Sequence, residues 1–209
     1  MAKKDNSTWR HKVRLRRELI ETVADPVVME THGGWGKLYK EVWYRAGRGI
    51  VLEKNEEKAE VLSRQRPTWA VYCADSEKAI AGGVGAHLPC NIFDVDPYGS
   101  PFATIQAILK SERKLPDTVH LVVNDGLRQK VQLGGAYHVE CLKGIVADYG
   151  NDLYGVYLDV AKEMVRRIAK TAGFSLAAWR GYYCGFGHNM THYHALLNRV
   201  SGAVERASD

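Results

Sequence analysis

Hydrophobic positions along the chain follow two different periods. Short runs of β-branched and other apolar residues predict five strands, at 26–30, 49–53, 69–73, 91–94 and 118–124. Between them, apolar residues recurring every three or four positions predict helices at 36–45, 55–63 and 100–113, and a longer helix follows at 153–172. Two further strand-like runs, 174–184 and 190–200, are joined by a glycine-containing connection and predict a hairpin.

Residues at the ends of these segments support the helix assignments. Asn55 is suited to cap the helix that follows it, and Ser100 with Pro101 predicts a cap followed by a proline at the first helical position. Gly173 predicts the end of the long helix.

Strands that alternate with helices predict an α/β fold with a mostly parallel sheet covered on both faces, here with an antiparallel hairpin at the end. The 209 residues contain no repeat or linker, so we expect a basic N-terminal arm or helix (1–24) and one larger domain (25–209). Five β/α units and a hairpin are the layout of class I methyltransferases, which predicts a Rossmann-like, seven-stranded sheet.

The composition, 45% hydrophobic and 25% charged, is that of an ordinary globular protein and argues against disorder or a disulfide scaffold. The longest uncharged run, 181–198, contains three histidines, so we expect no membrane span. No apolar stretch follows the basic start, and the four cysteines form no C-x-x-C pair; both features favour a reducing cytoplasm.

Charge is concentrated at the N-terminus, where residues 1–20 carry seven basic and two acidic side chains and leave 22 of each sign in the remainder. Such an arm is suited to phosphate backbones, although a solvated first helix would look the same. The seven basic residues are Lys3, Lys4, Arg10, Lys12, Arg14, Arg16 and Arg17.

A glycine-rich segment, Glu30-Thr31-His32-Gly33-Gly34-Trp35-Gly36, follows the first strand. Glycines let a backbone approach a ligand, and the next helix offers unpaired N–H groups. The segment matches no G-x-G-x-x-G pattern, and His32 stands where methyltransferases usually have glycine, so a simple strand-to-helix turn remains an alternative.

Acidic residues end the next two strands. Glu53, followed by Lys54, is placed to bind the ribose hydroxyls of an adenosine, and Asp75, followed by Ser76, to accept from the adenine amino group. Each acid alone could be a cap or a surface residue. Together with the glycine-rich segment they predict an adenosine-containing cofactor.

The segment after the fourth strand carries the chemistry. An exocyclic amine of a nucleobase is a poor nucleophile, because its lone pair is delocalised into the ring. Asp96 and the Pro97 carbonyl could each accept one of its N–H groups, directing the lone pair at a methyl donor, while Tyr98 could stack on the base. The alternative is an Asx-type turn before a proline-started helix.

The run Asp94-Val95-Asp96-Pro97-Tyr98-Gly99-Ser100-Pro101 closely resembles a segment of the tRNA guanine-N2-dimethyltransferases. Weaker similarities to that family lie at Cys141 with Tyr149-Gly150, at 163–166 and at His192-Tyr193. The resemblance implies that S-adenosylmethionine is the cofactor and that the acid and proline hold the target amine. The residues expected to bind the cofactor are Glu30, His32, Gly33, Gly34, Gly36, Glu53, Lys54, Asp75, Ser76 and Asp94.

We therefore predict methyl transfer to an exocyclic amine, guanine N2 in RNA being favoured, with Asp96, Pro97 and Tyr98 as catalytic residues. The alternatives are a DNA adenine or cytosine amino-methyltransferase and a cofactor-binding nucleic-acid module without turnover. Cys184, His188, His192 and His194 have weak metal-ligand spacing, and we expect no metal. The segment 126–133 is expected to contact nucleic acid or to be a solvated loop.

Overall fold

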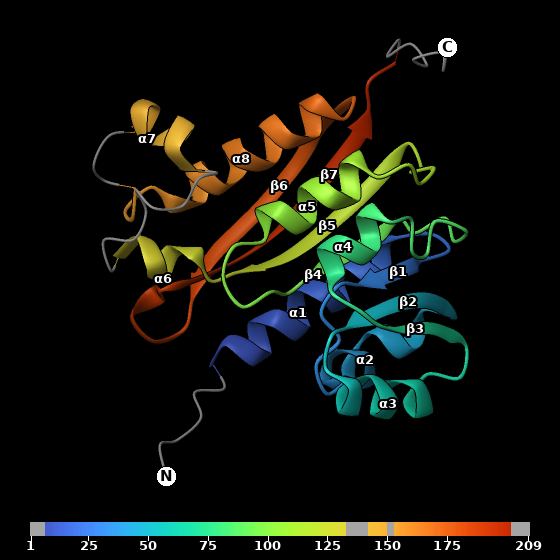
Figure 1. Cartoon of the computed structure of the whole chain (residues 1–209). Helices are drawn as coiled ribbons and strands as arrows, with labels where there is room; N and C mark the ends of the chain where they lie inside the picture. Colours follow the sequence, from blue (N-terminus) through green and yellow to red (C-terminus); the bar gives the residue numbers. More distant parts are fainter. Residues whose placement is uncertain (1–6, 133–141, 150–152, 202–209) are drawn as a thin grey trace.

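The computed structural model describes residues 7–132, 142–149 and 153–201. Seven strands form one sheet in the order β3-β2-β1-β4-β5-β7-β6, in which β1 to β5 are parallel and β7 is antiparallel to both β5 and β6 (Figure 1). The strands are β1 Val27–Glu30, β2 Arg48–Glu53, β3 Trp69–Cys73, β4 Ile92–Val95, β5 Thr118–Asp125, β6 Phe174–Cys184 and β7 Met190–Arg199. The predicted seven-stranded, mostly parallel sheet with a C-terminal hairpin is confirmed.

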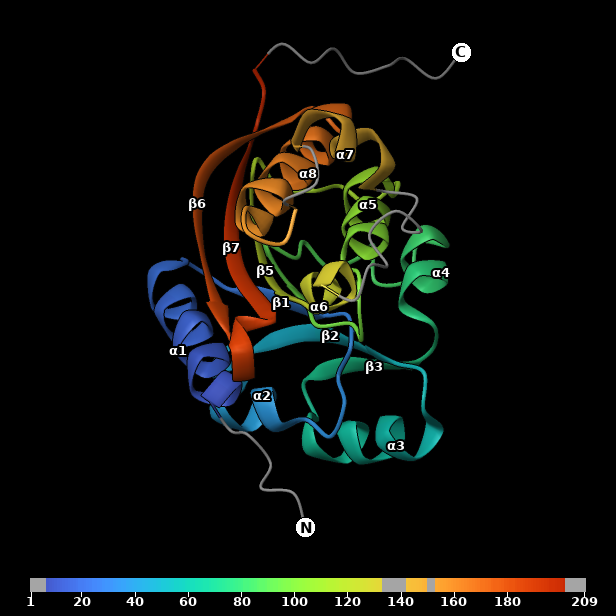
Figure 2. The same ribbon diagram turned by 90° about the vertical axis from the view of Figure 1, so that its left-hand side faces the viewer.

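Helices cover both faces of the sheet, with α4, α5 and α8 on one side and α1, α2 and α3 on the other (Figure 2). The helices are α1 Ser7–Thr22, α2 Lys37–Glu41, α3 Glu56–Gln65, α4 Ser76–Ala81, α5 Phe102–Lys110, α6 Leu127–Gln132, α7 Lys143–Tyr149 and α8 Tyr157–Thr171, with short 3-10 turns η1 Trp43–Arg45 and η4 Phe186–His188. Within these described ranges, no helix has the length and apolar character needed to cross a bilayer.

Most predicted helix ends are close to the observed ones. The Asn55 side chain accepts a hydrogen bond from the Lys58 backbone N–H at 3.0 Å, and Gly173 has a φ of 77° just beyond α8. Pro101 occupies the cap position of α5 instead of the first helical position.

The predicted helix at 36–45 was too long. It breaks at Val42, whose φ of −135° leaves the helical region, and η1 then buries Trp43 completely. The long helix begins at Tyr157 rather than at 153, and α4 was not predicted, since six residues are too few to show a helical period.

Helix α1 is packed against the body of the protein. Val13, Leu15, Leu19 and Ile20 are buried in the hydrophobic cluster that also contains residues of β1, β2 and β5. The segment expected to be a basic arm or helix therefore supplies, from residue 7 to residue 22, one of the helices that cover the sheet.

Candidate active site at the carboxyl edge of the sheet

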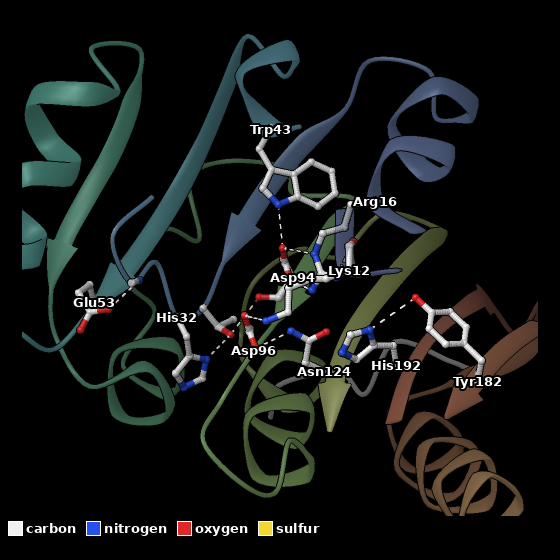
Figure 3. A network of polar contacts seen from close by, with 12 residues as sticks. Lys12, Arg16, His32, Trp43, Glu53, Asp94, Asp96, Asn124, Tyr182 and His192 are labelled. Atoms are coloured by element: carbon white, nitrogen blue, oxygen red, sulfur yellow. Dashed lines mark hydrogen bonds and ion pairs between the residues drawn. The ribbon is translucent and has the colours of Figure 1, made fainter. Parts of the chain in front are cut away.

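The order of the parallel strands reverses between β1 and β4, and two loops leave the sheet there. In open α/β sheets ligands bind at this point, beyond the carboxyl ends of the strands. Glu30 at the end of β1 is the register partner of Asp94 in β4, and the Thr31 N–H donates to the Asp94 carbonyl at 2.9 Å. His32 and Asp96, two residues beyond this pair, therefore begin the loops on either side of the switch point (Figure 3).

The glycine-rich loop turns tightly against β2. Gly33 donates its N–H to the Leu52 carbonyl at 3.0 Å, and Gly34 and Gly36 have φ angles of 54° and 72°, which favour glycine. The Gly34 N–H donates to Oε2 of Glu53 at 2.8 Å, and a Cβ on Gly34 would meet open space. The loop therefore presents its backbone at the surface of the carboxyl edge, next to the acid that ends β2.

We expect Gly33→Ala to destabilise the protein by about 1–3 kcal/mol, because the new methyl group overpacks a filled space. A Cβ at Gly33 would lie 2.4 Å from Cγ2 of Val51 and 2.7 Å from Cδ1 of Leu62. Urea unfolding measures the change. Gly47→Ala is the matched control, since nothing lies within 4 Å of its Cβ; equal stability of the two variants would show that the loop repacks freely.

Two hydrogen bonds hold the Glu53 carboxylate in place and leave acceptor positions for a ligand. Its Oε1 accepts the Asn55 N–H at 2.9 Å and its Oε2 accepts that of Gly34, while its side chain is almost fully buried. A carboxylate has about four acceptor positions, so two remain for hydroxyl groups of a ligand. The neighbouring Lys54 side chain is exposed at the surface.

Asp75 and Ser76 join the site as the start of α4. The Asp75 carboxylate caps the helix by accepting the Lys78 N–H at 3.2 Å, and the residue remains partly exposed beyond β3. Ser76 is buried, and its hydroxyl donates to the Thr31 carbonyl. This bond joins α4 to the loop that follows β1.

Two acids predicted to bind the cofactor are engaged by the protein itself. Asp94 is buried, and its oxygens accept Nε and Nη2 of Arg16 at 2.8 and 2.5 Å and Nε1 of Trp43 at 2.7 Å. Glu30 is also buried and forms an ion pair with Arg66. Both carboxylates are therefore held by protein partners and fix the two strand ends that flank the site, and a direct contact of either acid with the cofactor stays a prediction.

Asp96 lies at the switch point, and each of its carboxylate oxygens accepts a hydrogen bond. Its Oδ2 accepts Nζ of Lys12 at 2.7 Å, and its Oδ1 accepts Nδ2 of Asn124 at 2.5 Å (Figure 3). The side chain keeps 26% of its surface exposed, so its remaining lone pairs are open to a docked group. Asp96 is thus an oriented, charged acceptor beside the glycine-rich loop.

The residues after Asp96 form an exposed turn. Tyr98 is fully exposed, and Gly99, with a φ of 116°, accepts the Gly126 N–H at 3.1 Å through its carbonyl. This bond ties the turn to the end of β5. Pro97 and Tyr98 therefore stand at the rim of the site, on a segment fixed at both ends.

Sequence reasoning did not find the partners that hold the two aspartates. The sequence indicates Lys12 and Arg16 only as charges of the basic arm, and Asn124 as part of a pocket or a turn. A spacing of four residues places Lys12 and Arg16 on one helical face, and this pattern predicts that the two side chains point toward the same part of the protein. The identity of their partners, 84 and 78 residues away, carries no local signal.

The other charges of the N-terminal helix are mostly paired as well. Arg14 bonds Glu18 and Arg17 bonds Glu41, which leaves Arg10 exposed; Lys3 and Lys4 lie outside the described residues. A role of this helix in binding phosphate backbones stays a prediction. Because Arg14 and Arg17 are paired with acids, fewer basic side chains are available for it than the sequence of the helix indicates.

The alternative of a solvated loop at 126–133 is wrong over the described part, while contact with nucleic acid stays a prediction for the exposed Lys130. Residues 127–132 form α6, and Arg128 is buried between the rings of Tyr154 and Tyr183, its guanidinium carbon 3.8 Å from each ring centre. Its Nε also donates to the Tyr154 carbonyl at 3.1 Å. Arg128 therefore holds loops together and is not available to nucleic acid.

Of the two histidines in β7, His192 is buried and His194 is partly exposed. His192 is buried beside Asn124 in the β5–β7 register, and Tyr182 lies 3.5 Å from its Nδ1. Burial lowers the pKa of His192 to about 2, so the ring is neutral. In the described part of the chain, no three His, Cys, Asp or Glu side chains gather as a metal site would require. Cys141 and Gly150 lie outside the described residues.

Comparison with known proteins identifies the architecture. No protein-family model and no curated protein sequence matches the chain. Among solved structures, Trm1 from Pyrococcus horikoshii with S-adenosyl-L-methionine superposes with a TM-score of 0.67 at 13% identity, over 92% of this chain and 55% of Trm1. This chain thus spans little more than half of that protein.

Two further structures agree with it. TYW2 from M. jannaschii, in complex with AdoMet, has a TM-score of 0.60 at 12% identity over 96% of this chain and 79% of its own. The plantazolicin methyltransferase BpumL, in complex with a pentazolic desmethylPZN analog and SAH, has a TM-score of 0.56 at 10% identity over 92% of this chain and 84% of its own. Together with the strand order and the site at the switch point, these likenesses show that the chain has the Rossmann-like fold of the class I methyltransferases.

Proposed function

We propose that this protein transfers a methyl group from S-adenosylmethionine to an exocyclic amine of a nucleobase, with guanine N2 in RNA as the favoured substrate. The observation that carries the proposal is the position of Asp96. An ionised acceptor, oriented by Lys12 and Asn124, opens onto the strand-order switch point beside the glycine-rich loop.

The residues at the carboxyl edge fit the proposed cofactor. The spare lone pairs of Glu53 suit the ribose hydroxyls, and Asp75, exposed beyond β3, suits the adenine amino group. The open space at Gly34 lets the backbone approach the ligand closely, whereas Gly36 packs against Leu62 and Gln65 of α3. When bound, the cofactor supplies a methyl group on a positively charged sulfur. Three structures with the same fold contain this cofactor or its product.

Asp96 and Pro97 act on the amine in this proposal. A carboxylate and a backbone carbonyl that each accept one N–H draw the amine lone pair out of conjugation and stabilise the positive charge that develops on nitrogen. Because Lys12 and Asn124 hold the carboxylate before substrate arrives, little reorganisation is needed during the reaction.

The substrate assignment rests on the resemblance of 94–101 to the tRNA guanine-N2-dimethyltransferases and on the rim of the site. Tyr98 exposes its whole ring and can stack on an extruded base. Trp35, which is 47% exposed in the glycine-rich loop, offers a second aromatic surface with Lys58 over its ring at 5.7 Å.

Radiolabelled cofactor tests the function directly. The protein is incubated with labelled S-adenosylmethionine and, in separate reactions, with total RNA, genomic DNA or a peptide mixture, and the products are digested and identified by mass spectrometry. We expect label in N2-methylguanosine. Label in a DNA amino group or a peptide would change the substrate, and cofactor binding without any transfer would indicate a binding module.

We expect Glu53→Gln to weaken cofactor binding roughly tenfold to a hundredfold, because a charge-assisted hydrogen bond to a hydroxyl contributes about 1.5–3 kcal/mol. Isothermal titration calorimetry measures the affinity. Glu56→Gln, an exposed change in the first turn of α3, is the control and should bind as the wild type does. Equal affinities would remove Glu53 from the cofactor site.

A further inference from the structure

His32 belongs to the glycine-rich segment after β1, and its side chain lies in the site. It follows Thr31, which continues the pairing of β1 with β4. Figure 3 shows the His32 ring beside Asp96, on the side of the glycine-rich loop and Glu53. His32 is partly exposed.

The Thr31 hydroxyl is the hydrogen-bond partner of the His32 ring. Its oxygen lies 2.8 Å from Nδ1 of His32 and 3.1 Å from the Asp94 carbonyl, which can only accept. When the single hydroxyl hydrogen is directed at this carbonyl, the oxygen accepts from Nδ1, and Nε2 keeps its lone pair.

The ring stays neutral in spite of its acidic surroundings. Carboxylates face it from β2, β4, the loop after β4 and α4; they are Glu53, Asp94, Asp96 and Glu77. All four raise the pKa of His32, but desolvation by burial has the larger effect and lowers it. A neutral imidazole at neutral pH is able to take up a proton.

Asp96 is less suited to that task. Each of its two oxygens already accepts a hydrogen bond, one from the ammonium group of Lys12 and one from the amide of Asn124. The amine loses one N–H proton during methylation, and a second group beside Asp96 is needed to receive it without disturbing this arrangement.

We propose that Nε2 of His32 is the proton acceptor of the reaction, an inference that rests on the proposed function. As the amine nitrogen forms its bond to the methyl carbon, the carbon–sulfur bond breaks and leaves its electron pair on sulfur. The N–H proton of the cationic nitrogen passes to Nε2, and the imidazolium later returns it to solvent. Thr31 is the positioning residue, since its hydroxyl selects the tautomer.

The test uses His32→Asn, whose amide can still donate to Thr31 but which has no basic nitrogen. We expect kcat to fall by about 10²-fold or more, the usual contribution of a general base, with the calorimetric affinity for S-adenosylmethionine within about twofold of wild type. The decrease of kcat toward acid pH should disappear in the variant. His87→Asn, an exposed change in the loop before β4, is the matched control.

The variant His32→Gly distinguishes a basic role of the ring from a space-filling one. It removes the whole imidazole and leaves room for it, so added imidazole should recover part of the lost kcat. Full activity of either variant without imidazole would overturn the proposal. Loss of cofactor affinity in His32→Asn would overturn it as well, because His32 would then be a cofactor ligand.

A spectroscopic readout is independent of turnover. In ¹⁵N NMR of the cofactor-free protein, we expect the His32 ring to show hydrogen on Nδ1 only, and Thr31→Val to shift it toward a mixture of tautomers. A hydrogen on Nε2 in the wild type would overturn the inference. Inactivity of the wild type toward every substrate would instead overturn the proposed function and this role with it, whereas an active His32→Asn beside an active wild type refutes this inference alone.

Discussion

Replacing Asp96 with asparagine should reduce methyl transfer by about 10²–10³-fold, the usual cost of removing one group that stabilises charge in a transition state. Asparagine has nearly the same shape but one acceptor oxygen and no charge. The change also leaves Lys12, which is 19% exposed, without its anionic partner. Single-turnover transfer to total RNA measures the rate.

The cofactor should bind this variant as tightly as the wild type, because the residues assigned to it are on other loops. Asp117→Asn is the matched control: Asp117 is 91% exposed and pairs with Arg199 before β5, at the opposite edge of the sheet. Unchanged transfer by Asp96→Asn, or an equal loss in Asp117→Asn, would contradict the role given to Asp96.

Replacing Arg16 with methionine should destabilise the protein by about 3–5 kcal/mol, since it leaves the Asp94 carboxylate buried without a countercharge. Arg16 and Asp94 are both inaccessible to solvent, and only the Trp43 N–H would remain as a partner. The midpoint of urea unfolding, with the slope unchanged, measures the loss.

Arg14→Met is the control for this prediction. Arg14 is 71% exposed and forms an i,i+4 pair with Glu18, and because solvent screens such a pair, its loss should leave the unfolding midpoint almost unchanged. In the double variant Arg16→Met with Asp94→Asn, the buried charge is removed and part of the stability should return. A loss of less than 1 kcal/mol in Arg16→Met would refute the importance of the pair.

Helix α1 supplies the partners of both aspartates in these two predictions. Lys12 and Arg16 lie one helical turn apart, and they bond Asp96 and Asp94, two residues apart on one strand end. Helix α1 therefore stabilises the fold through the Arg16–Asp94 pair and orients the Asp96 carboxylate through Lys12.

Much of the fold was readable from local patterns. Strand residues alternate or cluster within four to eight positions, and helix ends are marked by single residues such as Asn55 and Gly173, so neighbours along the chain suffice to predict them. The short helices α4 and α6 were missed for the converse reason, because a helix of six residues barely completes one apolar period.

The sequence by itself determined the strand ends, the glycine-rich loop and the acid–proline–tyrosine segment, since each depends on residues that are adjacent in the chain. Only the tertiary structure decided what these residues contact. Asp94 and Asp96 look equivalent in the sequence, yet one is buried by Arg16 and Trp43 and the other opens to the site. Side chains two apart on a strand point the same way, and the depth at which each lies depends on which distant helix packs over it.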